Sequence, residues 1–220
     1  MATPGQLVET TAAILGIPQP TIALFDRVLA EHGFRSKGGR GRSAAKVNSR
    51  DATHLLMAVI GSSMSGASTK DAARACKIYA SLPNLRKASW PENFSMFGLP
   101  SLANLPKKHS LVDALSTLID AAARGEQFEI PPAYRRGIFP EEYDDVGVIG
   151  GPFFRIEFQG PRPWVHIIAD ISSKTRRHSK LARLVYFDRT TTGGERGDLI
   201  NEASIGFRTI RALSLLEKAT

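Results

Sequence analysis

Apolar residues in the first third of the chain recur at spacings of three and four, which is the period of an amphipathic helix. Residues 7 to 32 predict two short helices that are separated by Gly16. Two more helices are expected, one that begins at Ser49, a residue type favoured at the N-cap, and one that follows Ser68 and Thr69. The apolar positions of the four helices are Leu7, Val8, Ala12 and Leu15, then Ile22, Phe25, Val28 and Leu29, then Ala52, Leu55, Leu56, Val59 and Ile60, and finally Ala72, Ala75, Cys76 and Tyr79.

The pattern changes in the last third of the chain, where apolar and polar residues alternate as they do in strands. The segments FFRIEF, WVHIIADI and LARLVYFD each predict a strand, and a further strand is expected near Ala203 to Phe207. A C-terminal helix containing Ile210, Leu213 and Leu216 follows. We therefore expect a small antiparallel sheet accompanied by helices, and an α+β fold for the chain as a whole.

Prolines separate these two patterns. Residues 82–109 contain Pro83, Pro91, Pro100 and Pro106, so this segment is predicted to be an irregular, tethered linker. A helix is then expected to begin with a capping box between Ser110 and Asp113. The predicted domains are an N-terminal domain at 1–81, the linker at 82–109, and a C-terminal α+β domain at 110–220 that dimerises the protein or binds a partner.

The charge of the chain points to a polyanionic partner. The formal net charge is +8 at pH 7 and the pI is about 9.9, which attracts nucleic acid at neutral pH. The single cysteine, Cys76, forms no intramolecular disulfide and fits a reducing compartment. The sequence shows neither a signal peptide nor a long apolar run. We therefore expect a cytoplasmic protein that has no membrane partner.

The sequence contains none of the common catalytic or cofactor motifs. The histidines do not occur at metal-ligand spacing, and Walker A, GxGxxG and GxSxG patterns are missing. Five residues between 170 and 186 have chemistry suited to a nuclease or recombinase, but their spacing matches no catalytic pattern. We predict a protein that is not an enzyme and uses no metal or cofactor. The five residues weighed are Asp170, Lys174, Arg177, His178 and Tyr186.

The first two predicted helices fit a helix-turn-helix. Ala12 is small where the helices approach, and Gly16 permits the positive φ of the turn. Ile22 and Phe25 then pack the second helix back onto the first. In this motif the second helix enters the major groove of duplex DNA, and its candidate contacts to bases or phosphates are Gln19, Thr21 and Arg27.

A basic segment follows directly after the second helix, without an acidic residue until Asp51. Glycines at 38, 39 and 41 let its backbone approach a groove or a phosphate, and its arginines suit a narrow minor groove. This segment is predicted to be the wing of a winged helix-turn-helix, and a solvated basic loop is the alternative. Its candidate DNA contacts are Arg35, Lys37, Arg40, Arg42 and Lys46. A second basic run at 174–183 is either a further phosphate contact or a solvated hairpin loop.

The order of helix, glycine turn, helix, basic glycine-rich segment and a helix opening with NSRDATHLL resembles the DNA-binding head of MerR-like winged helix-turn-helix proteins, over residues 6–61. The resemblance implies that Gln19 to Arg27 face the groove, that Lys37 to Arg42 form the wing tip, and that the helix from Ser49 supports them. Ala23-Leu24-Phe25 stands where the family usually has an aromatic pair and an acid. No long dimerisation helix follows, so effector binding and promoter distortion are not implied.

These features predict a sequence-specific protein for double-stranded DNA, acting as a bacterial or phage transcriptional regulator. A single small head makes few base contacts, so we expect a homodimer on two half-sites. One alternative is a DNA-packaging or recombination accessory, similar to the small-terminase adaptors of phages, which would form rings. The other is a module that binds RNA or an acidic protein through its basic loop.

Overall fold

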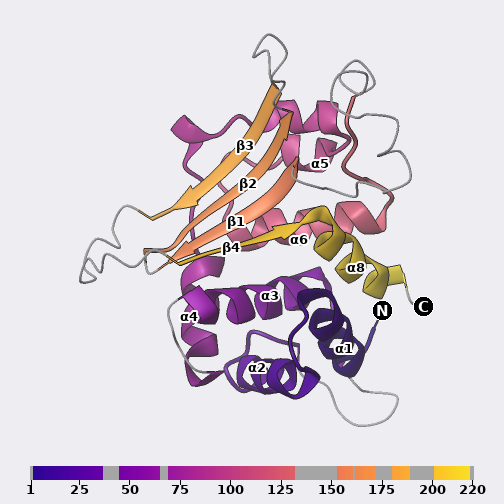
Figure 1. Ribbon diagram of the computed structural model, residues 1–220, viewed down its shortest axis with the longest axis vertical. Coiled ribbons are helices and arrows are strands. Elements are labelled where there is room, and N and C mark those ends of the chain that lie inside the picture. Colours follow the sequence, from indigo (N-terminus) through magenta and orange to yellow (C-terminus); the bar gives the residue numbers. More distant parts are fainter. Residues whose placement is uncertain are drawn as a thin grey trace.

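Helices and one four-stranded antiparallel sheet make up the fold, so the α+β class expected from the sequence is confirmed (Figure 1). The structure is a computed structural model. It describes residues 2–36, 45–64, 69–131, 153–160, 162–171, 180–188 and 201–218. Within these residues, no helix combines the length and the apolar character needed to span a membrane.

The N-terminal part of the molecule is helical (Figure 1). A capping box between Thr3 and Gln6 starts its first helix, and Gly16 ends that helix with a φ of 66°. The third helix is capped by Asn48, whose side chain accepts a hydrogen bond from the backbone amide of Asp51, and the predicted cap Ser49 is its first residue. The elements are α1 (Pro4–Leu15), α2 (Gln19–Glu31), α3 (Ser49–Met64), η2 (Thr69–Asp71) and α4 (Ala72–Ala80).

The sheet lies in the C-terminal part, and its strands are antiparallel neighbours in the order β3-β2-β1-β4. Strict alternation of buried and partly exposed residues along β1 explains why FFRIEF forms a strand with one face on the core. After β4, the chain turns directly into the C-terminal helix. The elements are β1 (Phe154–Gly160), β2 (Trp164–Ile171), β3 (Lys180–Phe187), β4 (Asn201–Gly206) and α8 (Phe207–Lys218).

The segment between the helical part and the sheet packs on both. Phe94 and Phe97 are fully buried, whereas Trp90 is 43% exposed. The backbone amide of Trp90 donates to the carbonyl of Arg183 at 2.7 Å, so this segment runs along the free edge of β3. Its elements are η3 (Arg86–Ala88), η4 (Pro91–Phe97) and α5 (Pro100–Ala103), and α6 (Leu111–Ala123) follows, started by the predicted capping box of Ser110 and Asp113.

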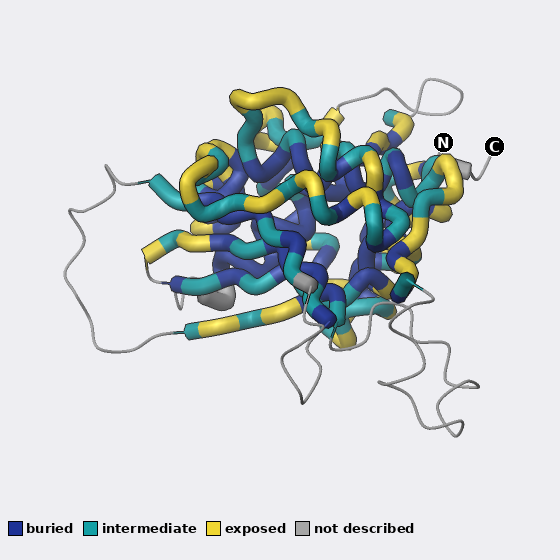
Figure 2. Tube along the Cα trace, turned by 90° about the horizontal axis from the view of Figure 1, so that it is seen from above, coloured by how far each residue is buried: buried dark blue, intermediate teal, exposed yellow. Residues whose placement is uncertain are grey.

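One contiguous core joins the helices to the sheet (Figure 2). The ring of Tyr79 on α4 lies 5.8 Å from that of Phe158 on β1, and its hydroxyl donates to the carbonyl of Gln159 at 2.8 Å. At the other end of β1, Phe154 packs against Phe207 at the start of α8. Residues of the predicted linker contribute to the same core, and the division at residues 81 and 109 stays a prediction.

Candidate nucleic-acid interface

The turn between α1 and α2 has the conformation that the sequence predicts. Gly16 adopts the left-handed backbone region, and the amide of Ile17 donates to the carbonyl of Ala12 at 3.1 Å. Ile22 is fully buried and Phe25 nearly so, and both pack α2 onto its neighbours. The chain therefore reverses direction at Gly16, and α2 presents its opposite side to solvent.

The solvent-exposed face of α2 is formed by Pro20, Leu24, Arg27 and Glu31, whose spacings of four, three and four place them on one side of the helix. In Figure 1, α2 lies at the end of the molecule that is furthest from the sheet. Leu24 is 45% exposed, which makes it one of the few large apolar side chains at the surface of the described residues. We call these four residues the α2 face.

The predicted contacts on α2 are exposed to different degrees. Arg27 lies in the middle of the α2 face and has no ion-pair partner among the described residues. Gln19 is exposed in the first turn, while Thr21 is half-buried, and the two lie on opposite flanks of the face. Lys46 is exposed just before α3. The predicted wing contacts Lys37, Arg40 and Arg42 lie outside the described residues.

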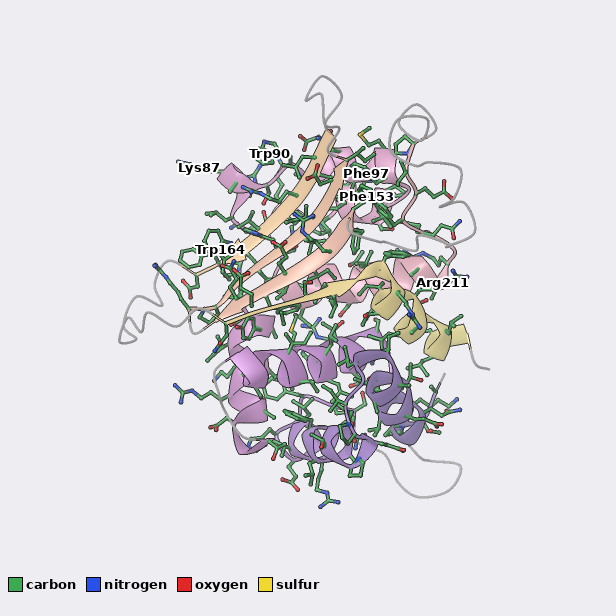
Figure 3. The ribbon with its side chains drawn as sticks, viewed as in Figure 1. Lys87, Trp90, Phe97, Phe153, Trp164 and Arg211 are labelled. Atoms are coloured by element: carbon green, nitrogen blue, oxygen red, sulfur yellow. The ribbon has the colours of Figure 1, made fainter. Side chains whose placement is uncertain are left out.

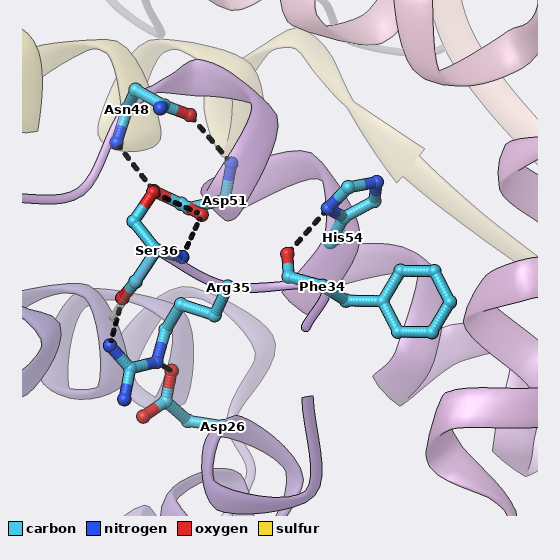
Figure 4. Close-up of polar contacts among 7 residues, drawn as sticks. All are labelled: Asp26, Phe34, Arg35, Ser36, Asn48, Asp51 and His54. Carbon is cyan, nitrogen blue, oxygen red and sulfur yellow. Dashed lines mark hydrogen bonds and ion pairs between the residues drawn. The ribbon is translucent and has the colours of Figure 1, made fainter. Parts of the chain in front are cut away.

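Arg35 is held inside the fold (Figure 4). Its Nε lies 2.7 Å from Oδ1 of Asp26 on α2, and the two side chains are only 15% and 11% exposed. One of its terminal nitrogens donates to the carbonyl of Ser36 at 2.9 Å. Burial raises the pKa of Asp26 above its ordinary value, and the Arg35 guanidinium opposes this rise. Arg35 thus fastens the chain after α2 to α2 itself.

Asp51 fixes both ends of the basic segment (Figure 4). Its carboxylate accepts hydrogen bonds from the backbone amide of Ser36 at 2.9 Å and from the Ser36 hydroxyl at 3.0 Å. It also accepts from the backbone amide of Asn48 at 3.1 Å, while Asn48 caps α3 in return. A carboxylate with several such partners is well satisfied at this nearly buried site. Residues 36 and 48 are therefore held beside the first turn of α3.

His54 adds a further tie one turn along α3 (Figure 4). Its Nδ1 lies 2.7 Å from the carbonyl of Phe34, and its ring meets the Phe34 ring edge to face, with centroids 5.4 Å apart. Burial lowers the pKa of His54, and the charge of Arg50 acts in the same direction. The hydrogen bond to the Phe34 carbonyl opposes this fall, and it requires a proton on Nδ1, which then donates to the carbonyl.

The sequence predicted the turn at Gly16, and the role of Arg27 as a DNA contact stays a prediction, but the groups that hold the basic segment were not identified. Asp26 occurs within an otherwise apolar stripe, and Asn48 precedes Asp51 by three residues as in a capping box. Both patterns are visible in the sequence and could have indicated that these side chains hold the basic segment. Leu24 and Glu31 follow from the helical period once the buried stripe is known. No group of three or more metal-binding side chains occurs within the described part of the chain.

No family model, curated protein or solved structure matches this chain. The geometry of the α2 face and of the residues that hold the basic segment is therefore the basis for a functional proposal.

Proposed function

We propose that this protein binds double-stranded DNA, with α2 in the major groove and the basic segment at 37–46 against the flanking backbone. The supporting observation is that α2 leaves one face open after the Gly16 turn, while Arg35 ties the start of the basic segment to Asp26 on the buried side of α2 and Asp51 holds it beside α3. On this proposal the first 61 residues form a winged helix-turn-helix head, and the protein is a bacterial or phage transcriptional regulator.

The side chains of the α2 face suit base and phosphate contacts. Arg27 can pair with guanine through two hydrogen bonds or bind a phosphate, and Gln19 can pair with adenine. The exposed side chain of Leu24 is suited to the methyl group of thymine. Glu31 carries a negative charge on the same face, so it is expected to oppose binding to a phosphate backbone.

Arg27 and Glu31 allow a test in which two variants have opposite effects. Arg27→Ala is expected to weaken duplex binding and to lower the slope of log affinity against log salt by about one. Glu31→Gln removes a repulsive charge from the same face, so it is expected to tighten binding. Arg211→Ala is the matched control, because Arg211 is an exposed arginine on α8, away from α2 (Figure 3).

A target duplex is first selected from a pool of random sequences by its binding to the protein. The affinity for this duplex, carrying a fluorescent label, is then measured by fluorescence anisotropy over a range of salt concentrations. Equal effects of Arg27→Ala and Arg211→Ala would show that duplex binding depends on overall charge, and the α2 proposal would then be wrong.

Replacing Arg40 and Arg42 together by alanine is expected to lower the salt slope by about two. An unchanged slope would remove the basic segment from the interface.

The regulator proposal also includes a homodimer, in which two heads bind half-sites about one helical turn apart. Light scattering measures the number of copies in the free protein and in its complex with a duplex that carries two half-sites. A ring of many copies would instead favour the packaging accessory.

A further inference from the structure

The face of the sheet that points away from the core carries aromatic rings next to arginines. Trp164 on β2 and Phe187 on β3 are direct cross-strand partners, and their ring centroids lie 5.7 Å apart. The guanidinium of Arg162 lies 4.8 Å from the centroid of the Phe187 ring. These three side chains form the first aromatic cluster of this surface, which we call the outer face.

A second aromatic cluster lies further along β3. Trp90 pairs with Arg183 through the backbone, and the Arg183 guanidinium lies 4.9 Å from the Trp90 ring. Arg183 is four residues from Phe187, so the two clusters are roughly 13 Å apart along the strand. Figure 3 shows Trp90 and Trp164 along the same margin of the sheet, with Lys87 nearby.

Both tryptophans of the chain are exposed at this surface. Trp90 is 43% and Trp164 39% exposed, although large aromatic rings are normally placed in a core or an interface. Arg162 and Arg183 have no ion-pair partner among the described residues. The Nε of Arg183 donates to the carbonyl of Ala88 at 3.1 Å, which leaves its terminal nitrogens for a ligand. Aromatic rings and guanidinium groups therefore occur together on the half of the outer face formed by β2, β3 and the neighbouring edge.

Carboxylates lie close to both clusters, because Asp188 follows Phe187 directly and the exposed Glu92 is two residues after Trp90. Glu157 on β1 pairs with Arg155, and Glu202 on β4 accepts a hydrogen bond from the Gln159 side chain at 2.7 Å. Asp170 lies at the opposite end of β2 from Trp164. Arg86 and Lys87 of η3 are exposed and add positive charge at the β3 edge. Among the described residues, the four cations Arg86, Lys87, Arg162 and Arg183 lie near the two clusters together with the three carboxylates Glu92, Asp170 and Asp188, so the formal charge there is only slightly positive.

We propose that the aromatic half of the outer face binds single-stranded nucleic acid. Bases stack on Trp164 with Phe187 and on Trp90, and Arg162 and Arg183 contact the phosphates between them. Aromatic rings on an open sheet, combined with arginines, are the general chemistry by which proteins hold unpaired bases. Duplex DNA does not fit this surface in the same way, because its base faces are stacked on one another.

This inference is independent of the duplex-binding function proposed for α2. The α2 face and the outer face belong to different elements, and Figure 1 shows α2 and β3 at opposite ends of the molecule. Each surface can therefore be tested while the other is intact.

The two tryptophans are the natural reporters, because the chain has no others. Intrinsic fluorescence is measured while an oligomer of about twelve thymidines or uridines is added. Stacking is expected to quench the fluorescence in a saturable way, and comparison of the two oligomers shows whether DNA or RNA is preferred. An abasic deoxyribose-phosphate oligomer of the same length has the same charge without bases, so it is expected to bind much more weakly.

Substitutions then locate the site. Trp164→Leu is expected to weaken binding of the thymidine oligomer by about fivefold to 150-fold, which corresponds to the loss of one stacked base. Trp164→Phe keeps an aromatic ring and is expected to retain most of the affinity. Arg162→Ala is expected to lower the salt slope by about 0.7. Arg27→Ala on α2 is expected to leave binding of the oligomer unchanged.

Three results would overturn the proposal. The first is equal binding of the abasic and thymidine oligomers, which would show an electrostatic surface alone. The second is an affinity that does not differ between the wild-type protein, Trp164→Leu and Trp164→Phe, with the Trp90 signal as the reporter. The third is loss of oligomer binding in Arg27→Ala, which would place single-strand binding on the α2 face.

Discussion

The carboxylate of Asp51 binds Ser36 twice, through the backbone amide at 2.9 Å and the hydroxyl at 3.0 Å. The same carboxylate accepts from the amide of Asn48, so one nearly buried side chain holds the two ends of the basic segment and the start of α3. The Asp51 carboxylate therefore stabilises the fold, because its removal would leave the donors of Ser36 and Asn48 without an acceptor.

Asp51→Ala is expected to lower the free energy of unfolding by about 2 to 4 kcal/mol, since it removes three hydrogen bonds, one of which is half of the capping box with Asn48. Urea unfolding followed by circular dichroism measures the change. Asp71→Ala is the control, because Asp71 precedes α4 without a side-chain capping bond, and an effect under about 0.5 kcal/mol is expected there. Similar losses in the two variants would contradict the role given to Asp51.

The ion pair of Arg35 and Asp26 leads to a second prediction. Arg35→Met leaves the Asp26 carboxylate buried without its partner, so a loss of about 3 to 5 kcal/mol is expected. Asp26→Asn is expected to cost less, because burial already raises the pKa of this carboxyl and disfavours its charge. Urea unfolding of both variants at neutral pH ranks them. The reverse order would mean that the charge of Asp26 is the more important half of the pair.

Arg35→Met also separates stability from DNA binding. Arg35 was expected to contact DNA from its place in the basic segment, but its guanidinium is occupied by Asp26 and the Ser36 carbonyl. Asp51 still holds Ser36 in this variant, so duplex affinity per folded molecule is expected to stay within about twofold of the wild-type value, with no change in salt slope. A slope lower by one would show that Arg35 reaches a phosphate after all.

The sequence predicted the elements whose pattern is local. The stripe of Ile22, Phe25 and Leu29 placed α2, and the positive φ of Gly16 placed the turn before it. The alternation in FFRIEF placed β1, because a strand with one buried face must alternate. Capping residues also gave the start of α6 correctly.

Relationships between distant residues could not be predicted in this way. Composition and spacing do not show that Trp90 lies along β3, because this pairing joins residues that are far apart in the chain. The aromatic half of the outer face could not be predicted from the sequence for the same reason. Arg35 appeared to be one more cation of a basic run, and only its distance from Asp26 shows that it is an internal partner.

The buried histidine of α3 predicts a dependence of stability on pH. Burial lowers the pKa of His54 below its ordinary value of 6.5, so the unfolded chain takes up a proton there before the folded protein does. Stability from this group is therefore complete above pH 6.5 and is lost as the pH falls through 6.5 toward the folded pKa. Unfolding free energies measured from pH 7.5 down to about pH 5 are expected to decrease.

His54→Asn is the variant that isolates this effect. An asparagine amide can donate to the Phe34 carbonyl in place of Nδ1 but does not titrate, so a flatter pH profile is expected. His166 on β2 also has a lowered pKa, mainly through burial, and part of the dependence is expected to remain. Asp26 contributes to the pH dependence of stability with the opposite sign, because its raised pKa favours the folded state at lower pH. This contribution is the same in the wild type and in His54→Asn. Identical profiles for His54→Asn and the wild type would exclude His54 as a source.

The contact between α3 and α4 depends on the absence of a side chain at Gly61. A Cβ placed there would lie 2.6 Å from Cδ2 of Tyr79, and that ring has little freedom because its hydroxyl is bonded to the carbonyl of Gln159. Gly61→Ala is therefore expected to destabilise the protein by overpacking, at about 1 to 3 kcal/mol, against a gain in helix propensity of about 1 kcal/mol. The net effect corresponds to a fall in Tm of a few degrees.

Gly5→Ala in α1 is the control, because the nearest atom to its Cβ is Thr3 Oγ1 at 3.9 Å, and a small rise in Tm is expected. A higher Tm in both variants would show that Tyr79 moves easily, and that the tie between α4 and β1 is weaker than its hydrogen bond indicates.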